Sequence, residues 1–183
     1  MKKTAVLFAT GYEEVEALTV VDLLRRAKIG CDMISLEDQD RVTGSHGIGI
    51  YMDAKFSETD FSRYDGVILP GGMPGTRNLA ADSRVLALLR SFAGEGKLTA
   101  AICAAPTVLA KAGLLAGKKA VCYPGMEDQL TGAKVSYDPV AVDGTVITSR
   151  GLGTAIPFGL SIVQYFTGEE RAEALSASVV YGK

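Results

Sequence analysis

Cys103 is the residue of this sequence whose surroundings best suit covalent chemistry. It lies in the stretch LTAAICAAPT, between an apolar run and a proline that could begin a helix. A turn from a strand into a helix would place its sulfur among free backbone N–H groups, which stabilise an anion and lower the pKa of a thiol. A free cysteine is also commonly an inert, buried hydrophobic residue. The local pattern therefore leaves a nucleophile and a structural residue as about equal alternatives.

A glutamate near the start of the chain is the second candidate. In GYEEVEA, Glu13 and Glu14 would open a helix, where the helix dipole favours acids, so they require no function. Glu16 follows between Val15 and Ala17, and an exposed helical glutamate is the simpler interpretation. If Glu16 instead faces a pocket, burial would keep its carboxyl protonated near neutral pH. It could then donate a hydrogen bond to a thiolate or act as a base.

Two glycine-rich stretches could supply backbone donors. PGGMPGT contains Gly71 and Gly72, whose amides no Cβ shields, and the amide of Ala104 could be a second donor of an oxyanion hole. SRGLGT, which contains Arg150, precedes a predicted helix and could bind an anion. Each stretch could equally be an ordinary turn. Neither has the spacing of a phosphate-binding loop.

The other cysteines and the single histidine give weaker signals. Cys31 and Cys122 lie in or near predicted strands and are interpreted as structural. His46 lies in a glycine-flanked loop, where a solvated side chain is the simplest expectation. Three cysteines without metal-type spacing, with one histidine, predict neither a disulfide framework nor a zinc site of several His and Cys ligands. We therefore assign no residue to a metal, expect no cofactor and expect a cytoplasmic protein.

Short apolar runs alternate with amphipathic stretches, which predicts a mostly parallel sheet covered by helices on both faces. The predicted strands are 4–9, 31–36, 64–72, 98–103 and 120–123, with a small side hairpin that includes 47–53 and a β-hairpin over 140–149. The predicted helices are 13–27, 82–96, 106–113, a helix beginning near 154 or 155, and 169–180. In the first helix, the apolar face is predicted to contain Val15, Leu18, Val21 and Leu24.

Composition limits the classes of protein that this sequence could encode. Its 183 residues suffice for one domain over 1–183, with a substantial core. Apolar residues make up 48%, charged residues 22%, and the net charge is only −2, so neither nucleic acid nor an anionic membrane is expected as the main partner. No apolar run approaches the roughly 18 residues of a membrane span. Ligands of such sheets bind at the carboxyl ends of the strands, which would bring 11–16, 70–75 and 103–106 together.

The motifs GYEEVEA, YDGVILPGG, AAICAAP and TSRGLGTA occur in this order along the chain. Together they resemble the ThiJ/PfpI superfamily, most closely its DJ-one-like branch, over essentially the whole chain. The resemblance implies a flavodoxin-like three-layer α/β/α sandwich of the class I glutamine amidotransferase type, assembled as a homodimer. It implies that Cys103 is the reactive cysteine and Glu16 its protonated partner, with Gly72 and Ala104 as oxyanion donors. Further candidates for the pocket wall are Gly71, His46, Tyr123 and Arg150.

The resemblance also implies an activity. Members are described as cofactor-free glyoxalases, as deglycases of glyoxal- or methylglyoxal-modified protein and nucleotide, as redox-sensing chaperones and, in one branch, as proteases. We therefore expect an enzyme acting on a small reactive carbonyl compound or on glycated protein or nucleotide. A redox-sensing stress chaperone that uses the same oxidisable cysteine is the alternative, and a cysteine peptidase is a third.

Two departures from the family pattern narrow the mechanism. The protease-like branch carries a histidine directly after the cysteine, where this chain has Ala104. Human-type members carry a histidine before a proline on the following strand, where this chain has Tyr123, a poor base because its reference pKa is about 10. No histidine follows Cys103, which excludes the usual amidotransferase triad and weakens the peptidase reading. Cys103 must then be activated by its turn and by Glu16, and His46 lies where human-type members have an arginine.

Overall fold

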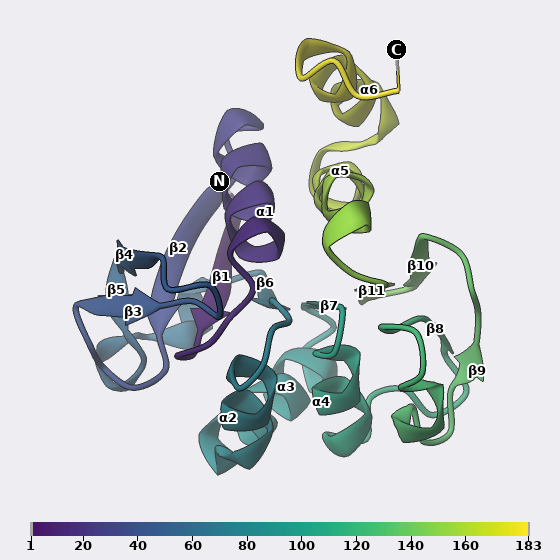
Figure 1. The fold of residues 1–183 in the computed structure, drawn as a ribbon. Helices are drawn as coiled ribbons and strands as arrows, with labels where there is room; N and C mark the ends of the chain where they lie inside the picture. Colours follow the sequence, from purple (N-terminus) through teal and green to yellow (C-terminus); the bar gives the residue numbers. More distant parts are fainter. Residues whose placement is uncertain (1, 183) are drawn as a thin grey trace.

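A sheet of seven strands forms the middle layer of the protein, in the order β10-β11-β7-β6-β1-β2-β5 (Figure 1). The computed structural model describes residues 2–182. Neighbouring strands of the seven-stranded sheet are parallel except for the antiparallel pair β10 and β11. The strands are β1 (Lys3–Phe8), β2 (Gly30–Ser35), β5 (Ala54–Lys55), β6 (Gly66–Leu69), β7 (Leu98–Ile102), β10 (Val140–Asp143) and β11 (Val146–Ser149). Two small sheets pair β3 (Arg41–Thr43) with β4 (Gly49–Tyr51), antiparallel, and β8 (Lys119–Ala120) with β9 (Lys134–Val135), parallel.

Helices cover both faces of this sheet (Figure 1). One face carries α1 (Glu14–Arg26) beside α5 (Ala155–Thr167), with α6 (Glu169–Ser178) packed on α5. The other face carries α2 (Gly75–Ala81), α3 (Ser83–Gly94) and α4 (Pro106–Lys111). Short 3₁₀ turns lie at Phe56–Glu58, Phe61–Arg63, Glu127–Gln129 and Leu152–Thr154. The predicted flavodoxin-like three-layer α/β/α sandwich with a small β-hairpin is confirmed.

The sheet has a separate apolar core on each face. Successive residues of a strand point to opposite faces, and Val6 of β1 accordingly joins the core beneath α1 and α5, whereas Leu7 joins the core above α3 and α4. Both side chains are fully buried. A strand buried on both sides has no polar face, which explains why its sequence reads as a continuous apolar run. None of the helices within residues 2–182 is long and apolar enough to cross a bilayer.

The buried face of α1 differs from the predicted one. Val15 is 46% exposed, whereas Val21 and Leu24 are buried as expected. The buried side of the helix begins instead with Glu14 and includes Glu16. The amphipathic pattern predicts polar residues on the solvent side of the helix. This prediction fails here because the start of the helix faces loops that supply hydrogen-bond donors. The difference matters because it directs the Glu16 side chain into the interior of the protein.

The strand predicted at 120–123 is also shorter than expected. Only Lys119–Ala120 pairs, with β9. The amide of Val121 donates instead to the Thr148 side chain (3.0 Å), and that of Tyr123 to the carbonyl of Cys103 (2.7 Å). These two bonds direct the segment across the end of the sheet and bring Tyr123 next to the cysteine turn.

Candidate active site

Cys103 occupies a sharp turn between β7 and α4. Its φ of 65° lies in the left-handed region, which costs a residue with a side chain about 1–2 kcal/mol. Two backbone hydrogen bonds hold the residue in that conformation. Its amide donates to the Ser149 carbonyl of β11 (3.0 Å), and its carbonyl accepts from the Tyr123 amide (2.7 Å). The half-buried thiol therefore projects from a strained turn at the carboxyl end of the sheet.

Glu16 reaches this thiol from the first turns of α1. The residue is only 1% exposed, and its carboxyl is hydrogen-bonded to the Cys103 side chain. The Gly71 amide donates to Glu16 Oε2 at 3.0 Å. A Cβ at Gly71 would lie 2.5 Å from both the Cys103 Cβ and Glu16 Oε2, so only glycine allows the two side chains to meet. The structure thus brings Cys103, Glu16 and Gly71 together at the carboxyl end of the sheet.

Two backbone N–H groups face the sulfur of Cys103. They belong to Ala104, the next residue of the turn, and to Gly72, which follows β6 and has a φ of 92°. A Cβ at Gly72 would lie 2.6 Å from the carbonyl carbon of Tyr12, so this loop is pressed against the start of α1. Donors in this position stabilise negative charge on the sulfur or on an oxygen bound to it.

Cys103 and Glu16 titrate as a coupled pair, so the charge state of the site depends on both side chains. Burial raises the pKa of Glu16 to about 7. Burial, followed by the Glu16 charge, raises the pKa of the Cys103 thiol to about 12, although the Ala104 and Gly72 amides act in the opposite direction. The amides of the turn thus lower the pKa of the thiol as expected, but burial and the Glu16 charge outweigh them. The two side chains share one proton above pH 7, and a thiolate forms only when Glu16 takes that proton.

Gly151 borders the site near Oε1 of Glu16, whereas Gly71 contacts Oε2. A Cβ added to it would lie 3.9 Å from Glu16 Oε1 and 3.6 Å from the Tyr123 ring. The pattern SRGLGT predicts a glycine turn but does not indicate that Gly151 borders the Glu16 carboxyl. Tyr123 lies at the rim with 52% of its surface exposed. Arg150 points away, since its Nη1 donates to the Tyr137 carbonyl at 3.2 Å.

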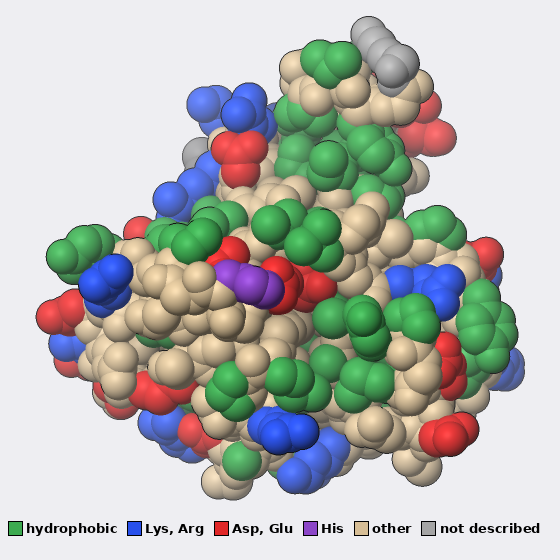
Figure 2. All heavy atoms as spheres, in the orientation of Figure 1, with side chains coloured by type: hydrophobic (Ala, Val, Ile, Leu, Met, Phe, Trp, Pro, Cys, Tyr) green, Lys and Arg blue, Asp and Glu red, His purple; other side chains and the backbone are tan. Residues whose placement is uncertain are grey.

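His46 lies on the surface beside the start of α1, where Figure 2 shows it between acidic side chains. Its side chain is 67% exposed, as the sequence predicted, and its Nδ1 lies 3.1 Å from Glu14 Oε2. Glu14 is buried, and its Oε1 accepts hydrogen bonds from the amides of His46 (2.8 Å) and Ile48 (3.4 Å). Glu14 therefore holds the β3–β4 loop against α1. The sequence indicates only a favourable interaction with the helix dipole for this residue. Within residues 2–182, Glu13, Glu14 and His46 are also the group whose spacing could hold a metal ion.

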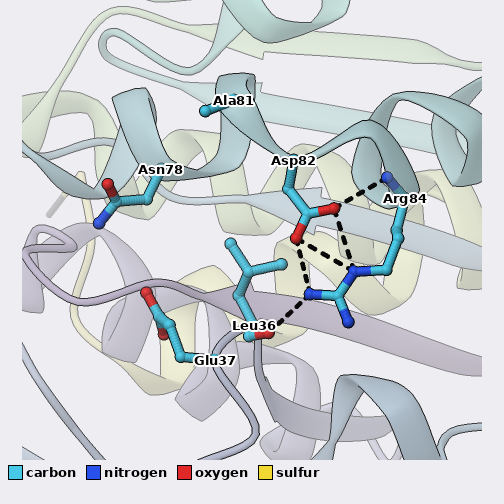
Figure 3. A pocket seen from close by; sticks show the side chains of 6 residues that line it. All are labelled: Leu36, Glu37, Asn78, Ala81, Asp82 and Arg84. Carbon is cyan, nitrogen blue, oxygen red and sulfur yellow. Dashed lines mark hydrogen bonds and ion pairs between the residues drawn. The ribbon is translucent and has the colours of Figure 1, made fainter.

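A separate hollow of about 430 Å³ lies beyond the ends of β2 and α2 (Figure 3). Arg84 crosses it, with its guanidinium bonded to both carboxylate oxygens of Asp82 and to the Leu36 carbonyl. The residues that line it are Leu36, Glu37, Asn78, Ala81, Asp82 and Arg84. It contains no residue of the cysteine site. Asp82 and Arg84 pair with each other, and Glu37 accepts a hydrogen bond from the Thr10 amide (2.9 Å).

Comparison with known proteins identifies the family to which this arrangement belongs. The sequence model of the DJ-1/PfpI family matches residues 2–165. The chain belongs to the DJ-1/PfpI family. It is 39% identical to the protein dj-1beta of Drosophila melanogaster over 181 residues, which cover 98% of this chain and 97% of that protein.

Two further DJ-1/PfpI relatives bear on the chemistry. A deglycase of Pyrococcus horikoshii is 31% identical over 150 residues, covering 81% of this chain and 89% of that protein. The solved structure of oxidised Toxoplasma gondii DJ-1 has a TM-score of 0.95 and 35% sequence identity, and the match covers 100% of both chains. The fold and the family are thus established for this chain, and a relative named as a deglycase points to enzymatic activity in the same family.

Proposed function

We propose that this DJ-1/PfpI protein is a cofactor-independent glyoxalase or deglycase that acts on glyoxal, methylglyoxal or their adducts with protein and nucleotide. The observation that carries the proposal is the convergence on one sulfur of Glu16 and the amides of Gly72 and Ala104. These are the parts that nucleophilic attack on a carbonyl group requires: a thiol, a base beside it and donors for the oxyanion. The archaeal relative named as a deglycase supports the same class of substrate.

In the proposed reaction, the Cys103 sulfur attacks the aldehyde carbon of methylglyoxal while Glu16 accepts the thiol proton. The resulting alkoxide lies near the Gly72 and Ala104 amides and takes this proton from Glu16, which gives the hemithioacetal and leaves Glu16 ionised again. Glu16 then moves a proton from the former aldehyde carbon to the neighbouring carbon, which converts the hemithioacetal into the thioester of lactate. Water cleaves the thioester, releases lactate and regenerates the thiol, so that the sum is methylglyoxal plus water to lactate. None of these steps requires a metal or an organic cofactor.

We expect purified protein to convert methylglyoxal into lactate, with a rate that rises as the pH is raised through about 7. The physical reason is that Glu16, whose pKa burial raises to about 7, must be ionised to accept the thiol proton, whereas the thiol itself keeps its proton far above this pH. Enzymatic assay of lactate at constant ionic strength between pH 5.5 and 9 gives the profile of kcat/KM. A profile that falls as the pH rises through 7, or the absence of lactate, contradicts the proposal.

A redox-sensing role of the same cysteine is the second candidate. Two amides and a carboxyl that surround a sulfur would also hold the oxygens of a sulfinate, and a similar DJ-1 structure has been solved in an oxidised state. Two equivalents of hydrogen peroxide would oxidise the thiolate to the sulfinate and be reduced to water. We expect intact-protein mass spectrometry after mild peroxide treatment to show two added oxygens, both on Cys103. Oxidation spread over all three cysteines and the methionines would count against this role.

We also propose that the protein forms a homodimer in the cytoplasm. Two apolar side chains next to the site support an interface there, because Val15 on α1 is 46% exposed and Ile48 on the adjoining loop is 55% exposed. Static light scattering is expected to give twice the mass of one chain, and Val15→Glu is expected to return the mass to that of a monomer. If wild-type protein elutes with the mass of a single chain at micromolar concentration, the dimer proposal is wrong.

A further inference from the structure

Three side chains of metal-ligating type converge on the surface next to the cysteine site. Glu13 and Glu14 come from the start of α1, and His46 comes from the loop between β3 and β4. His46 Nδ1 lies 3.1 Å from Glu14 Oε2 and 3.6 Å from Glu13 Oε1, and one donor atom from each of the three residues lies within 4.8 Å of the others. The hydroxyl of Ser45 lies in the same cluster, 3.0 Å from His46 Nδ1 and 3.2 Å from Glu13 Oε2.

This spacing matches the ligand shell of a small divalent cation. Tetrahedral Zn²⁺ binds nitrogen at about 2.0–2.1 Å and carboxylate oxygen at about 2.0–2.2 Å, which separates neighbouring ligand atoms by about 3.3–3.5 Å. The two distances from His46 Nδ1, 3.1 and 3.6 Å, lie on either side of that value. Two of the three separations in the group therefore suit a tetrahedral ion, and the donor atoms of all three residues lie within 4.8 Å of one another.

The position of the Glu14 carboxylate is set before an ion binds. Glu14 is buried, and two backbone amides of the β3–β4 loop hold its Oε1, which leaves Oε2 directed at His46. The same bonds hold the loop that carries His46 against α1. In the single chain the His46 side chain is 67% exposed, so an ion can reach it directly (Figure 2). A preset ligand geometry lowers the ordering cost of binding.

The charge of the cluster also favours a cation. Two carboxylates lie side by side, and within residues 2–182 neither Glu13 nor Glu14 forms an ion pair with a lysine or an arginine. A dication would neutralise both carboxylates. One imidazole and two carboxylates without a thiolate are ligands that suit Zn²⁺ and other divalent ions of the first transition row.

We propose that Glu13, Glu14 and His46 bind a divalent transition-metal ion, for which Zn²⁺ is the probe, with water or the Ser45 hydroxyl as the fourth ligand. The ion would lie on the outer side of the helix turn that carries Glu16, next to the cysteine site but with ligands of its own. This ligand set contains a single imidazole and differs from the site of several His and Cys ligands that the composition argued against. The inference is independent of the reaction proposed for Cys103.

Calorimetric titration of Zn²⁺ into the full chain tests the site. The titration uses a Cys103→Ser background, so that the reactive thiol cannot contribute. We expect one Zn²⁺ per chain, and His46→Gln and Glu13→Gln should each weaken binding by at least about ten-fold, because each removes a ligand. Glu95→Gln is the matched control, because Glu95 is exposed and within residues 2–182 its side chain pairs only with Lys97 and Ser91. The Zn²⁺ affinity of this variant should equal that of the background protein.

Spectroscopy separates this site from binding at the thiols. His46 is the only histidine of the chain, so its ring signals in NMR spectra report on this cluster alone. We expect these signals to shift with Zn²⁺ and to saturate at one equivalent, and the Co²⁺ form to show d–d absorption without a thiolate charge-transfer band. Unchanged His46 signals at excess Zn²⁺, a thiolate band in the Co²⁺ form, or equal affinity of the His46→Gln protein would each overturn the proposal.

Discussion

Replacing Cys103 with serine is expected to lower kcat/KM for the formation of lactate from methylglyoxal by about 10³-fold or more. A serine hydroxyl is a far weaker acid than a thiol, so the neighbouring carboxylate cannot generate the nucleophile from it. The turn itself should be unaffected, because serine has nearly the same size and the backbone bonds to Ser149 and Tyr123 involve only main-chain atoms. The measurement is initial lactate formation by both proteins at pH 8, with the far-ultraviolet circular dichroism spectrum as evidence that the variant is folded.

Cys31→Ala is the matched control for this experiment. Cys31 is a buried cysteine of β2 in the apolar core beneath α1, and burial raises the pKa of its thiol to about 11. Its replacement should reduce stability but leave the activity of the folded protein within about two-fold of wild type, because it has no contact with the site. Equal activities of Cys103→Ser and wild type would remove the basis of the proposed function.

Glu16→Gln is expected to have two large effects of opposite kinds. Lactate formation should fall by about 10²–10⁴-fold, since glutamine cannot accept the proton of the Cys103 thiol. At pH 8 the variant should nevertheless be more stable than wild type. Wild-type Glu16 must ionise in a buried position, and raising its pKa from 4.5 to about 7 corresponds to a free-energy cost of about 3 kcal/mol.

The stability difference should depend on pH in a defined direction. When the pKa of a carboxyl is higher in the folded protein than in the unfolded chain, the fold is more stable with that carboxyl protonated than with it ionised. Its contribution is complete below pH 4.5 and is lost as the pH rises through about 7. Urea unfolding of both proteins at pH 5 and pH 8 measures this directly. A gap between the two proteins that is equal at both pH values would show that the carboxyl is not protonated in the folded protein near neutrality.

The position of the nucleophile could be predicted from sequence because it depends on local features. An apolar strand, a cysteine, two alanines and a proline at the first position of a helix together define a strand-to-helix turn, and the structure places Cys103 there with a positive φ. The order of strands and helices followed from the same kind of local pattern. The family motifs then added Glu16 and the glycines of the β6 loop, which lie far from Cys103 along the chain.

Features that depend on contacts between distant segments could not be predicted in this way. The pattern of α1 favoured a buried Val15, yet Glu16 is buried instead, because the Gly71 amide and the Cys103 side chain satisfy its carboxyl. The helix-terminus argument predicted a lowered pKa for the thiol, and the burial of Cys103 together with the charge of Glu16 reverses it. Gly151 borders the site only because β11 lies next to β7 in the sheet.

The left-handed backbone of Cys103 has a consequence for attempts to engineer this protein. A turn that holds a side chain at a φ of 65° and a carboxyl buried beside it both reduce the stability of the fold. Variants chosen only for survival at high temperature will therefore accumulate changes at these positions and lose the reactive sulfur, although every such variant improves the property under selection. A useful screen must ask for catalysis and heat resistance in the same clone, because heat resistance alone favours a folded but inert protein.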